Sequence, residues 1–367
     1  MKKIEKILQK EELEKEDLVY LLSLEDDDEI ELLRQKAEKV LFDFVGNKVF
    51  YRGLIEFSNI CTSDCFYCGI RKSNAKPSRY SLSEEEIIEQ AKQCADLGYG
   101  SIVLQSGERS DEKFVSFVEK TVKKIKENSI SEKLPDGLGI TLCVGEQSEE
   151  NYRRLYNAGA HRYLLRIEAT NPILFEKIHP PSQKYETRIQ ALKALKKVGF
   201  QVGTGVMIGL PEQSYEDLAG DILFFKEMDI DMLGMGPYLV HNETPFAKYS
   251  DYYEKNKEKI YKLGLKMIAL CRIFLKDVNI ASTTALEAMH ECGREDGLSF
   301  GANVIMPQLT PIYRRKEYLL YEGKPCMELS AEEFNISISN KIASIGRVVG
   351  RDLWGDSKHA LKKTESK

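Results

Sequence analysis

Short apolar runs alternate with longer amphipathic segments along most of the chain. Eight runs are candidate strands: VFYRGLIEF from Val49, SIVLQ from Ser101, GITLCV from Gly139, RYLLRIE from Arg162, QVGTGVMIG from Gln201, MLGMGPY from Met232, IASTT from Ile280 and NVIMP from Asn303. Segments with helical spacing begin near Ser83, Asp111, Ser148, Thr187, Ser214 and Asp251. In the first of these, Ser83 and Glu86 form a capping-box signature, and Gly98 marks the helix end. Eight alternating units predict a parallel, TIM-type (β/α)8 barrel rather than an open doubly wound sheet.

The same pattern divides the chain into three predicted parts. Residues 1–46 are charged, with leucines at helical spacing, and predict an N-terminal helical cap. Residues 47–330 carry the eight units of the barrel. Residues 331–367 predict a C-terminal helix and charged tail packed on the barrel, with the single tryptophan, Trp354, as the anchor of the tail.

Composition narrows the class of protein. The 367 residues suit a barrel of ~250 residues with terminal additions. A formal net charge of -5 argues against a nucleic-acid-binding module, which usually has a concentrated positive field. The charged N-terminus lacks the apolar core of a secretory signal, and no apolar run reaches transmembrane length. We therefore expect a cytoplasmic protein without membrane association.

Three of the eight cysteines are crowded into one loop. The run FSNICTSDCFYCGIRK follows the first strand and places Cys61, Cys65 and Cys68 at C-x3-C-x2-C spacing. In a reducing compartment such cysteines are metal ligands or free thiols more often than disulfides. A structural zinc site usually has four protein ligands, as does a ferredoxin cluster. Three cysteines fit a 4Fe-4S cluster that keeps one iron open, although zinc with a borrowed His or Asp, or three unrelated thiols, are alternatives.

An open iron could bind the amino and carboxylate groups of S-adenosylmethionine (SAM). An electron from the cluster then breaks a carbon-sulfur bond of the sulfonium and yields methionine and a 5'-deoxyadenosyl radical. The trio, with the aromatic Tyr67 before its last cysteine, resembles the signature of the radical SAM superfamily. This resemblance implies that the three cysteines are the catalytic metal ligands.

Later motifs supply candidate SAM contacts. The run LQSGE ends the second strand; Gly107 and Glu108 match the end of the superfamily's GGE-like element, whereas Ser106 departs from its first glycine. In LLRIEAT, alternation places Arg166 and Glu168 on one face, as a pair for a zwitterionic ligand or as a structural ion pair. In GTGVMIGLP, Met207 and Leu210 could be apolar walls beside an adenine. Without the trio, SGE would be interpreted as a turn.

Taken together, FSNICTSDCFYCGIRK, RYSLSEEEI, IVLQSGE, RYLLRIEATNP, VMIGLP, the ASTT run and GANVIMP resemble the HydE family of FeFe-hydrogenase maturases over about residues 5–350. The resemblance implies that Arg166, Glu168, Arg188 and Tyr318 contact the cofactor. It also implies that a substrate cavity is lined by Arg52, Gln105, Thr141, Arg162, Ser282, Thr283, Thr284 and Tyr321. The implied substrate is an iron-cysteinate precursor, and the implied partners are an electron donor such as flavodoxin or ferredoxin and other hydrogenase maturases.

Several positions depart from the family pattern. After the barrel only Cys326 is available, so we expect no second cluster. Ile167 stands where histidine is expected, and Cys143 and Cys292 are additions near strand or loop ends. A HydE-like paralogue acting on another small thiol, thioether or amino acid is therefore an alternative. A non-catalytic iron-sulfur or zinc protein is a second alternative.

Overall fold

The computed structural model describes residues 2–325 and 327–365, and its centre is a ring of parallel strands. The strands are β1 (Lys48–Ser58), β2 (Ser101–Ser106), β3 (Gly139–Cys143), β4 (Arg162–Leu164), β5 (Gln201–Thr204), β7 (Met232–Leu233), β9 (Asn279–Ile280) and β10 (Val304–Ile305). They are hydrogen-bonded in the order β10-β1-β2-β3-β4-β5-β7-β9. The ends of this path meet at a bridge between Ala281 and Val304, where Ser282 N donates to Val304 O at 2.9 Å. The predicted TIM-type fold is confirmed.

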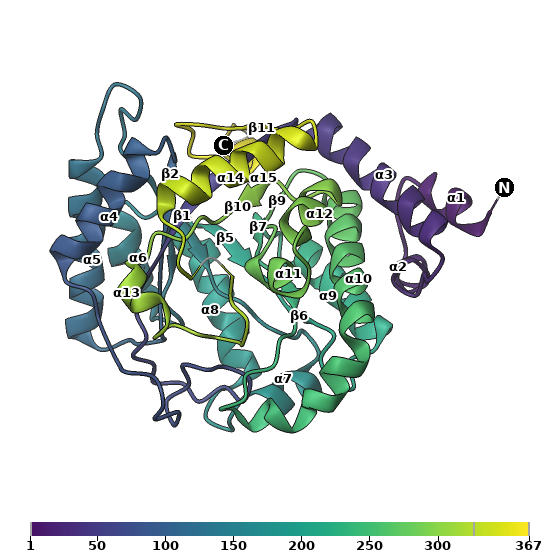
Figure 1. Ribbon diagram of the computed structural model, residues 1–367, viewed down its shortest axis with the longest axis horizontal. Coiled ribbons are helices and arrows are strands. Elements are labelled where there is room, and N and C mark those ends of the chain that lie inside the picture. Colours follow the sequence, from purple (N-terminus) through teal and green to yellow (C-terminus); the bar gives the residue numbers. More distant parts are fainter. Residues whose placement is uncertain (1, 326, 366–367) are drawn as a thin grey trace.

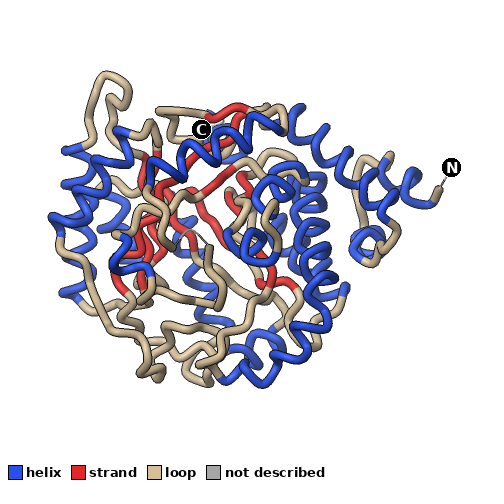
Figure 2. Tube along the Cα trace, viewed as in Figure 1, coloured by secondary structure: helices blue, strands red, loops and turns tan. Residues whose placement is uncertain are grey.

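Helices surround the strands, as Figures 1 and 2 show. They are α4 (Glu84–Asp96), α5 (Glu112–Asn128), α6 (Glu149–Asn157), α7 (Pro172–Ile178), α8 (Tyr185–Val198), α9 (Tyr215–Glu227), α10 (Ser250–Leu275), α11 (Thr284–Met289), α12 (Gly293–Ser299) and α13 (Ile312–Arg315), with a 3-10 turn at Pro245–Tyr249. Ser83, Asp111, Ser148 and Ser214 each cap a helix through the side chain, at or beside the predicted starts. None of the described helices is long and apolar enough to cross a membrane.

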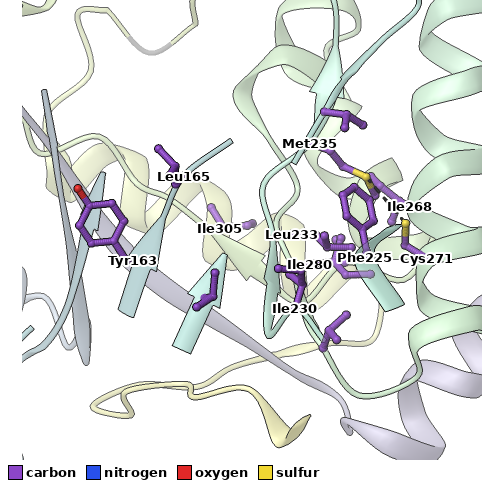
Figure 3. Close-up of a cluster of buried hydrophobic side chains, with 14 of the residues drawn as sticks. Tyr163, Leu165, Phe225, Ile230, Leu233, Met235, Ile268, Cys271, Ile280 and Ile305 are labelled. Atoms are coloured by element: carbon purple, nitrogen blue, oxygen red, sulfur yellow. Dashed lines mark hydrogen bonds between the residues drawn. The ribbon is translucent and has the colours of Figure 1, made fainter. Parts of the chain in front are cut away.

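The core lies between the strands and these helices. Figure 3 shows Leu233 and Met235, from the segment at β7, beside Phe225 of α9 and Ile268 and Cys271 of α10. All five side chains are buried. This packing fixes the strands against the helices and leaves the loops at the carboxyl ends of the strands free to form a site.

Two predicted strands are interrupted. The fifth run divides into β5 and β6 (Met207–Ile208), and the sixth into β7 and β8 (Gly236–Pro237), with β6 and β8 paired in a separate two-stranded sheet. At the break the backbones approach so closely that a Cβ on Gly205 would lie 2.2 Å from the carbonyl oxygen of Gly234. The seventh run is shorter than expected, because its strand ends at Ile280 and Thr283 is the N-cap of α11.

The chain ends pack against the barrel. At the N-terminal end, α1 (Lys3–Leu8), α2 (Lys15–Leu22) and α3 (Asp27–Phe44) form a helical group in which α2 packs on α9 and α3 on α10. At the other end lie α14 (Ala331–Ser344), β11 (Val348–Val349) and α15 (Lys358–Glu365), and β11 pairs with β1, which the sequence did not predict. The division at residues 46 and 330 stays a prediction.

Residues 354–356 close the floor of the barrel, at the amino ends of the strands. Arg162 donates to Trp354 O at 2.9 Å and to Asp356 Oδ1 at 2.6 Å, and Arg52 donates to Gly355 O at 3.1 Å. Both guanidinium groups are buried. The Trp354 ring stacks on His161, with ring centroids 4.7 Å apart, which fits its expected role as an anchor.

Candidate functional site

A cavity of about 300 Å³ opens at the carboxyl ends of the strands. Its wall includes all three clustered cysteines and residues from β1, β2, β3, β6 and β8. Other parts of the wall come from the segments after β4 and β7, from α11, and from the loop after α13. Functional residues of a (β/α) barrel gather at this end because the loops there are free to vary. Its volume lies at the lower end of the range usual for small-molecule sites.

The thiols of Cys61, Cys65 and Cys68 converge on this cavity. Burial raises the pKa of each thiol, and for Cys65 the pKa reaches about 12. The charge of Cys61 contributes to the raised pKa of Cys65, and the charges of Cys65 and Cys61 contribute to that of Cys68. A bound metal centre would be needed to keep all three as thiolates.

Among the described residues, no three His, Cys, Asp or Glu side chains converge tightly enough to hold a single metal ion. In a 4Fe-4S cubane, each cysteine binds a different iron, so the thiols stand further apart than around one ion. The number of cysteines fits the cluster better than a structural zinc site, which usually has four protein ligands.

Gly107 and Glu108 hold the cysteine loop against the end of β2. Glu108 N lies 3.3 Å from Cys61 Sγ, and Thr62 N donates to Glu108 O at 2.9 Å. The Glu108 carboxylate accepts from Ser63 Oγ at 2.6 Å and from Glu146 N at 3.0 Å. A Cβ on Gly107 would lie 2.5 Å from the carbonyl oxygen of Ile60, so only glycine allows this approach. The SGE motif is thus a connector between loops as well as part of the cavity wall.

Arg166 and Glu168 form an ion pair at 2.9 Å on the cavity wall, but not for the reason that alternation suggested. Strand β4 ends at Leu164, and Glu168 has a left-handed backbone with φ 66°. Burial raises the pKa of the Glu168 carboxyl, against the opposing effect of Arg166. Arg166 Nε is buried and has no hydrogen-bond partner in the described part of the chain, so the pair retains a donor for a ligand.

Arg188, from α8, connects this pair to Glu108. Its guanidinium donates to the carbonyl oxygen of Arg166 and to Glu146, and lies 3.7 Å from Glu108 Oε2. These carboxylates raise its pKa despite its burial. The cation therefore stays charged beside the cysteine loop.

Of the other expected cofactor residues, four line the cavity and one does not. Tyr67, Ser106, Met207 and Tyr318 line the cavity. Leu210 does not; it is 1% exposed and belongs to a hydrophobic cluster with Met207 and Tyr238. Leu210 can therefore support the wall only from behind.

The expected substrate residues fall into three groups: some line the main cavity, some line a smaller cavity, and some line neither. Gln105, Thr283, Thr284 and Tyr321 line the main cavity, and Thr284 Oγ1 lies 2.7 Å from the Tyr321 hydroxyl. Arg52 and Thr141 line a second, smaller cavity of about 30 Å³ near the floor, which shares Leu164, Gly234 and Met306 with the main one. Arg162 and Ser282 line neither cavity: Arg162 holds the tail, and Ser282 donates to Arg294 O at 2.9 Å.

A buried ion pair on the cavity wall was not predicted. Lys324, in the loop after α13, contacts Glu56 of β1, and Gln308 donates to the same carboxylate at 2.7 Å. Glu56 is 1% exposed. A charged residue between the apolar Ile55 and Phe57 was the available signal for Glu56, but nothing in the sequence marked Lys324 as its partner. The pair fastens residues 316–325 over the cavity.

Comparison with known proteins identifies the family. A family model described as Radical SAM superfamily matches residues 55–225. The [FeFe] hydrogenase maturase subunit HydE of Thermotoga maritima is 40% identical over 356 residues, which are 97% of each chain. The chain belongs to the HydE family of radical SAM enzymes. Membership makes it an enzyme that uses SAM and a 4Fe-4S cluster, which decides against the non-catalytic alternative.

More distant relatives agree with the fold of this HydE-family chain. The 3-methylornithine synthase of Methanosarcina acetivorans is 28% identical over 82% of this chain and 81% of its own. The crystal structure of methylornithine synthase PylB aligns with a TM-score of 0.77 at 23% identity, covering 95% of this chain and 97% of that one. The maturase HydG from Carboxydothermus hydrogenoformans aligns with a TM-score of 0.76 at 22% identity, covering 94% and 79%. These structures support the architecture alone.

The departures from the HydE pattern differ in their position. Ile167 is fully buried in the core and does not line the cavity, whereas Cys143 does. Burial raises the pKa of the Cys143 thiol to about 12. Cys292 is exposed, and Cys326 lies outside the described residues. Cys143 is therefore the departure that changes the chemistry of the cavity.

Proposed function

We propose that the chain is a hydrogenase maturase that binds its cluster through Cys61, Cys65 and Cys68 and cleaves SAM beside it. The observation that carries the proposal is the convergence of three thiols and the Arg166–Glu168 pair on one cavity, in a chain 40% identical to a HydE maturase. When bound, the cluster supplies the electron that splits SAM into methionine and a 5'-deoxyadenosyl radical. A reduced flavodoxin or ferredoxin supplies that electron.

The side chains divide the work of binding. Arg166 and Glu168 present opposite charges to the zwitterionic cofactor, and Arg188 keeps the anionic Glu108 in place next to the cysteine loop. Tyr67, Ser106, Gly107, Met207 and Tyr318 form the surrounding wall. The loop 316–325 covers part of the cavity. A radical generated here is thereby held away from solvent.

The substrate occupies the part of the cavity lined by Gln105, Thr283, Thr284 and Tyr321. Their amide and hydroxyl groups donate and accept hydrogen bonds without adding charge. This environment suits an iron-cysteinate complex passed on by a partner maturase. We expect one cluster and no second site.

A paralogue acting on another small thiol or thioether is the second candidate, and Cys143 is the observation that favours it. Its thiol faces the cavity where an exogenous sulfur compound would bind. A protonated thiol there adds a small, polarizable sulfur contact for such a compound. The two candidates differ in the substrate that triggers cofactor cleavage.

The deciding experiment uses the anaerobically reconstituted full chain with SAM and a chemical reductant. Formation of 5'-deoxyadenosine is measured with and without the iron-cysteinate complex, and with small thiols and thioethers in its place. Stimulation by the complex alone supports the maturase, and stimulation by a thiol or thioether alone supports the paralogue. The Cys65→Ser variant should lose iron and cleavage, whereas Cys143→Ser should keep both, because it removes a cavity thiol that is not a cluster ligand.

A further inference from the structure

Two residues behind the cavity wall are joined by hydrogen bonds that the proposed function does not use. Asp221, in the middle of α9, accepts at Oδ1 from Thr170 N at 3.0 Å and from Thr170 Oγ1 at 2.5 Å. Asp221 is 1% exposed, and its Oδ2 has no hydrogen-bond partner among the described residues. Both hydrogen bonds of this buried carboxylate therefore come from one residue, Thr170, in the segment after β4.

That segment carries the Arg166–Glu168 pair. Two residues before Thr170, the chain turns through the left-handed backbone of Glu168. Glu168 N donates to Gly205 O at 3.0 Å, and Met207 N donates to Glu168 O at 2.9 Å, so the turn is fixed on its β5–β6 side. A left-handed conformation is costly for a residue with a side chain and persists only where the surroundings hold it. The bonds to Asp221 hold the other side of the turn.

A second hydrogen bond joins the same segment to α9 one helical turn earlier. Asp217 lies on the same face of α9 and accepts from Asn171 Nδ2 at 2.7 Å. Two successive residues of the segment are therefore bonded to two carboxylates of one helix. Of these two residues, only Thr170 donates to α9 from both its backbone and its side chain. The two bonds fix its orientation as well as its position.

The charge environment shows that Asp221 is not an ordinary structural ion-pair residue. Burial, with a smaller contribution from the nearby Asp217, raises its pKa to about 7 against the opposing effect of the hydrogen bonds from Thr170. The other titratable groups affected by its charge are Tyr185 of α8 and Cys271 of α10, so no cation compensates it from these elements. A buried carboxyl without a cation lowers stability, and such costs are concentrated at functional sites.

We propose that Asp221 is a positioning residue: through Thr170 it fixes the turn at Glu168 and thereby aims the Arg166–Glu168 pair at the cofactor. The proposal rests on the proposed role of that pair in binding SAM. Asp221 itself touches neither the cavity nor the cysteines.

The test measures SAM affinity in the reconstituted holoenzyme, from the change that SAM produces in the electron paramagnetic resonance spectrum of the reduced cluster. Thr170→Val removes the hydroxyl and keeps the backbone N–H, and Asp221→Ala removes the oxygen that accepts both hydrogen bonds. We expect each to weaken SAM binding by about tenfold, the loss typical of a hydrogen bond to a charged group, with iron content unchanged. Thr170→Ser and Asp221→Asn keep the bonds and should restore affinity to within about twofold of the parent.

Thr121→Val is the matched control, because Thr121 of α5 is 1% exposed and its hydroxyl has no hydrogen-bond partner among the described residues. It should bind SAM like the parent. Glu168→Gln is measured in parallel. If Glu168→Gln weakens binding while Thr170→Val does not, the positioning role is overturned and the proposed function stands; if Glu168→Gln has no effect, the assigned SAM contact fails and takes the positioning role with it. Should Asp221→Ala fail to fold, the comparison of Thr170→Val with Thr170→Ser decides.

Discussion

The backbone N–H of Glu108 lies 3.3 Å from the sulfur of Cys61, so the end of β2 directly contacts a cysteine of the loop that follows β1. A hydrogen bond from a backbone amide stabilises a thiolate and tunes the potential of a cluster bound to it. The contact depends on the absence of a side chain at Gly107. The cysteine loop and the SGE motif are therefore one structural unit.

Gly107→Ala tests this unit. The added methyl group would overlap the carbonyl of Ile60 and the Cβ of Cys61, so we expect the loop to shift, with a loss of about 1–3 kcal/mol in the free energy of unfolding. Iron content after reconstitution should fall with it. Gly220→Ala on α9 has open space around the new methyl and should instead raise stability by ~1 kcal/mol. Full iron content in Gly107→Ala would contradict the assignment.

Lys324→Met tests the loop over the cavity. The substitution leaves the Glu56 carboxylate buried without its cation, a change that typically costs ~3–5 kcal/mol. We expect faster amide hydrogen exchange across residues 316–325 and more cofactor cleavage in the absence of substrate. Exposed Lys316, in the same loop, provides the control variant Lys316→Met, which should exchange like the parent. The double variant Glu56→Gln/Lys324→Met should recover part of the protection, because it removes the stranded charge.

The pH dependence of stability follows from Asp221. Its pKa is about 7 in the folded chain and ordinary when unfolded, so between about pH 4 and 7 the folded state holds a proton that the unfolded state has released. Stability is therefore lost as pH rises through this window and is constant above it. Asp221→Asn has no such proton, so its stability relative to the parent should rise from pH 5.5 to 8, by about 2 kcal/mol at 1.36 kcal/mol per pH unit below the folded pKa. Denaturant unfolding under anaerobic conditions at several pH values measures it, and a pH-independent difference would refute it.

Asp356→Ala tests the floor. Arg162 is fully buried and would lose its carboxylate partner, for an expected loss of ~3 kcal/mol in the free energy of unfolding. Glu112→Ala breaks another arginine-carboxylate pair, with Arg154, but the Glu112 side chain is 73% exposed and screened by water, so the loss should be much smaller. Equal effects in the two variants would show that burial does not decide the strength of these pairs.

Local signals predicted the local structure. Ser83, Asp111, Ser148 and Ser214 were recognisable as helix starts because a cap depends on residues three positions apart. The strand order followed from the alternation of strands and helices. The pairing of β11 with β1 joins Lys48 to Val348, and no local pattern could indicate it.

The parts of the site that lie in one contiguous motif could be predicted from the sequence. The parts that the fold assembles from distant segments could not. The cysteine trio stands in one loop, so its spacing was sufficient. Arg166 and Glu168 were correctly expected to meet, yet the cause is the left-handed turn at Glu168 rather than strand alternation. Glu56 and Lys324 lie 268 residues apart in sequence, and only the fold brings them together.

The floor of the barrel has a consequence for the order of events during translation. Arg52 and Arg162 precede the tail carbonyls that they bond by 303 and 192 residues. On the ribosome, both guanidinium groups therefore remain hydrated long after their own strands have emerged. Since contacts so distant in sequence form late, we expect the amino ends of the strands to stay accessible to water until the segment around Trp354 arrives.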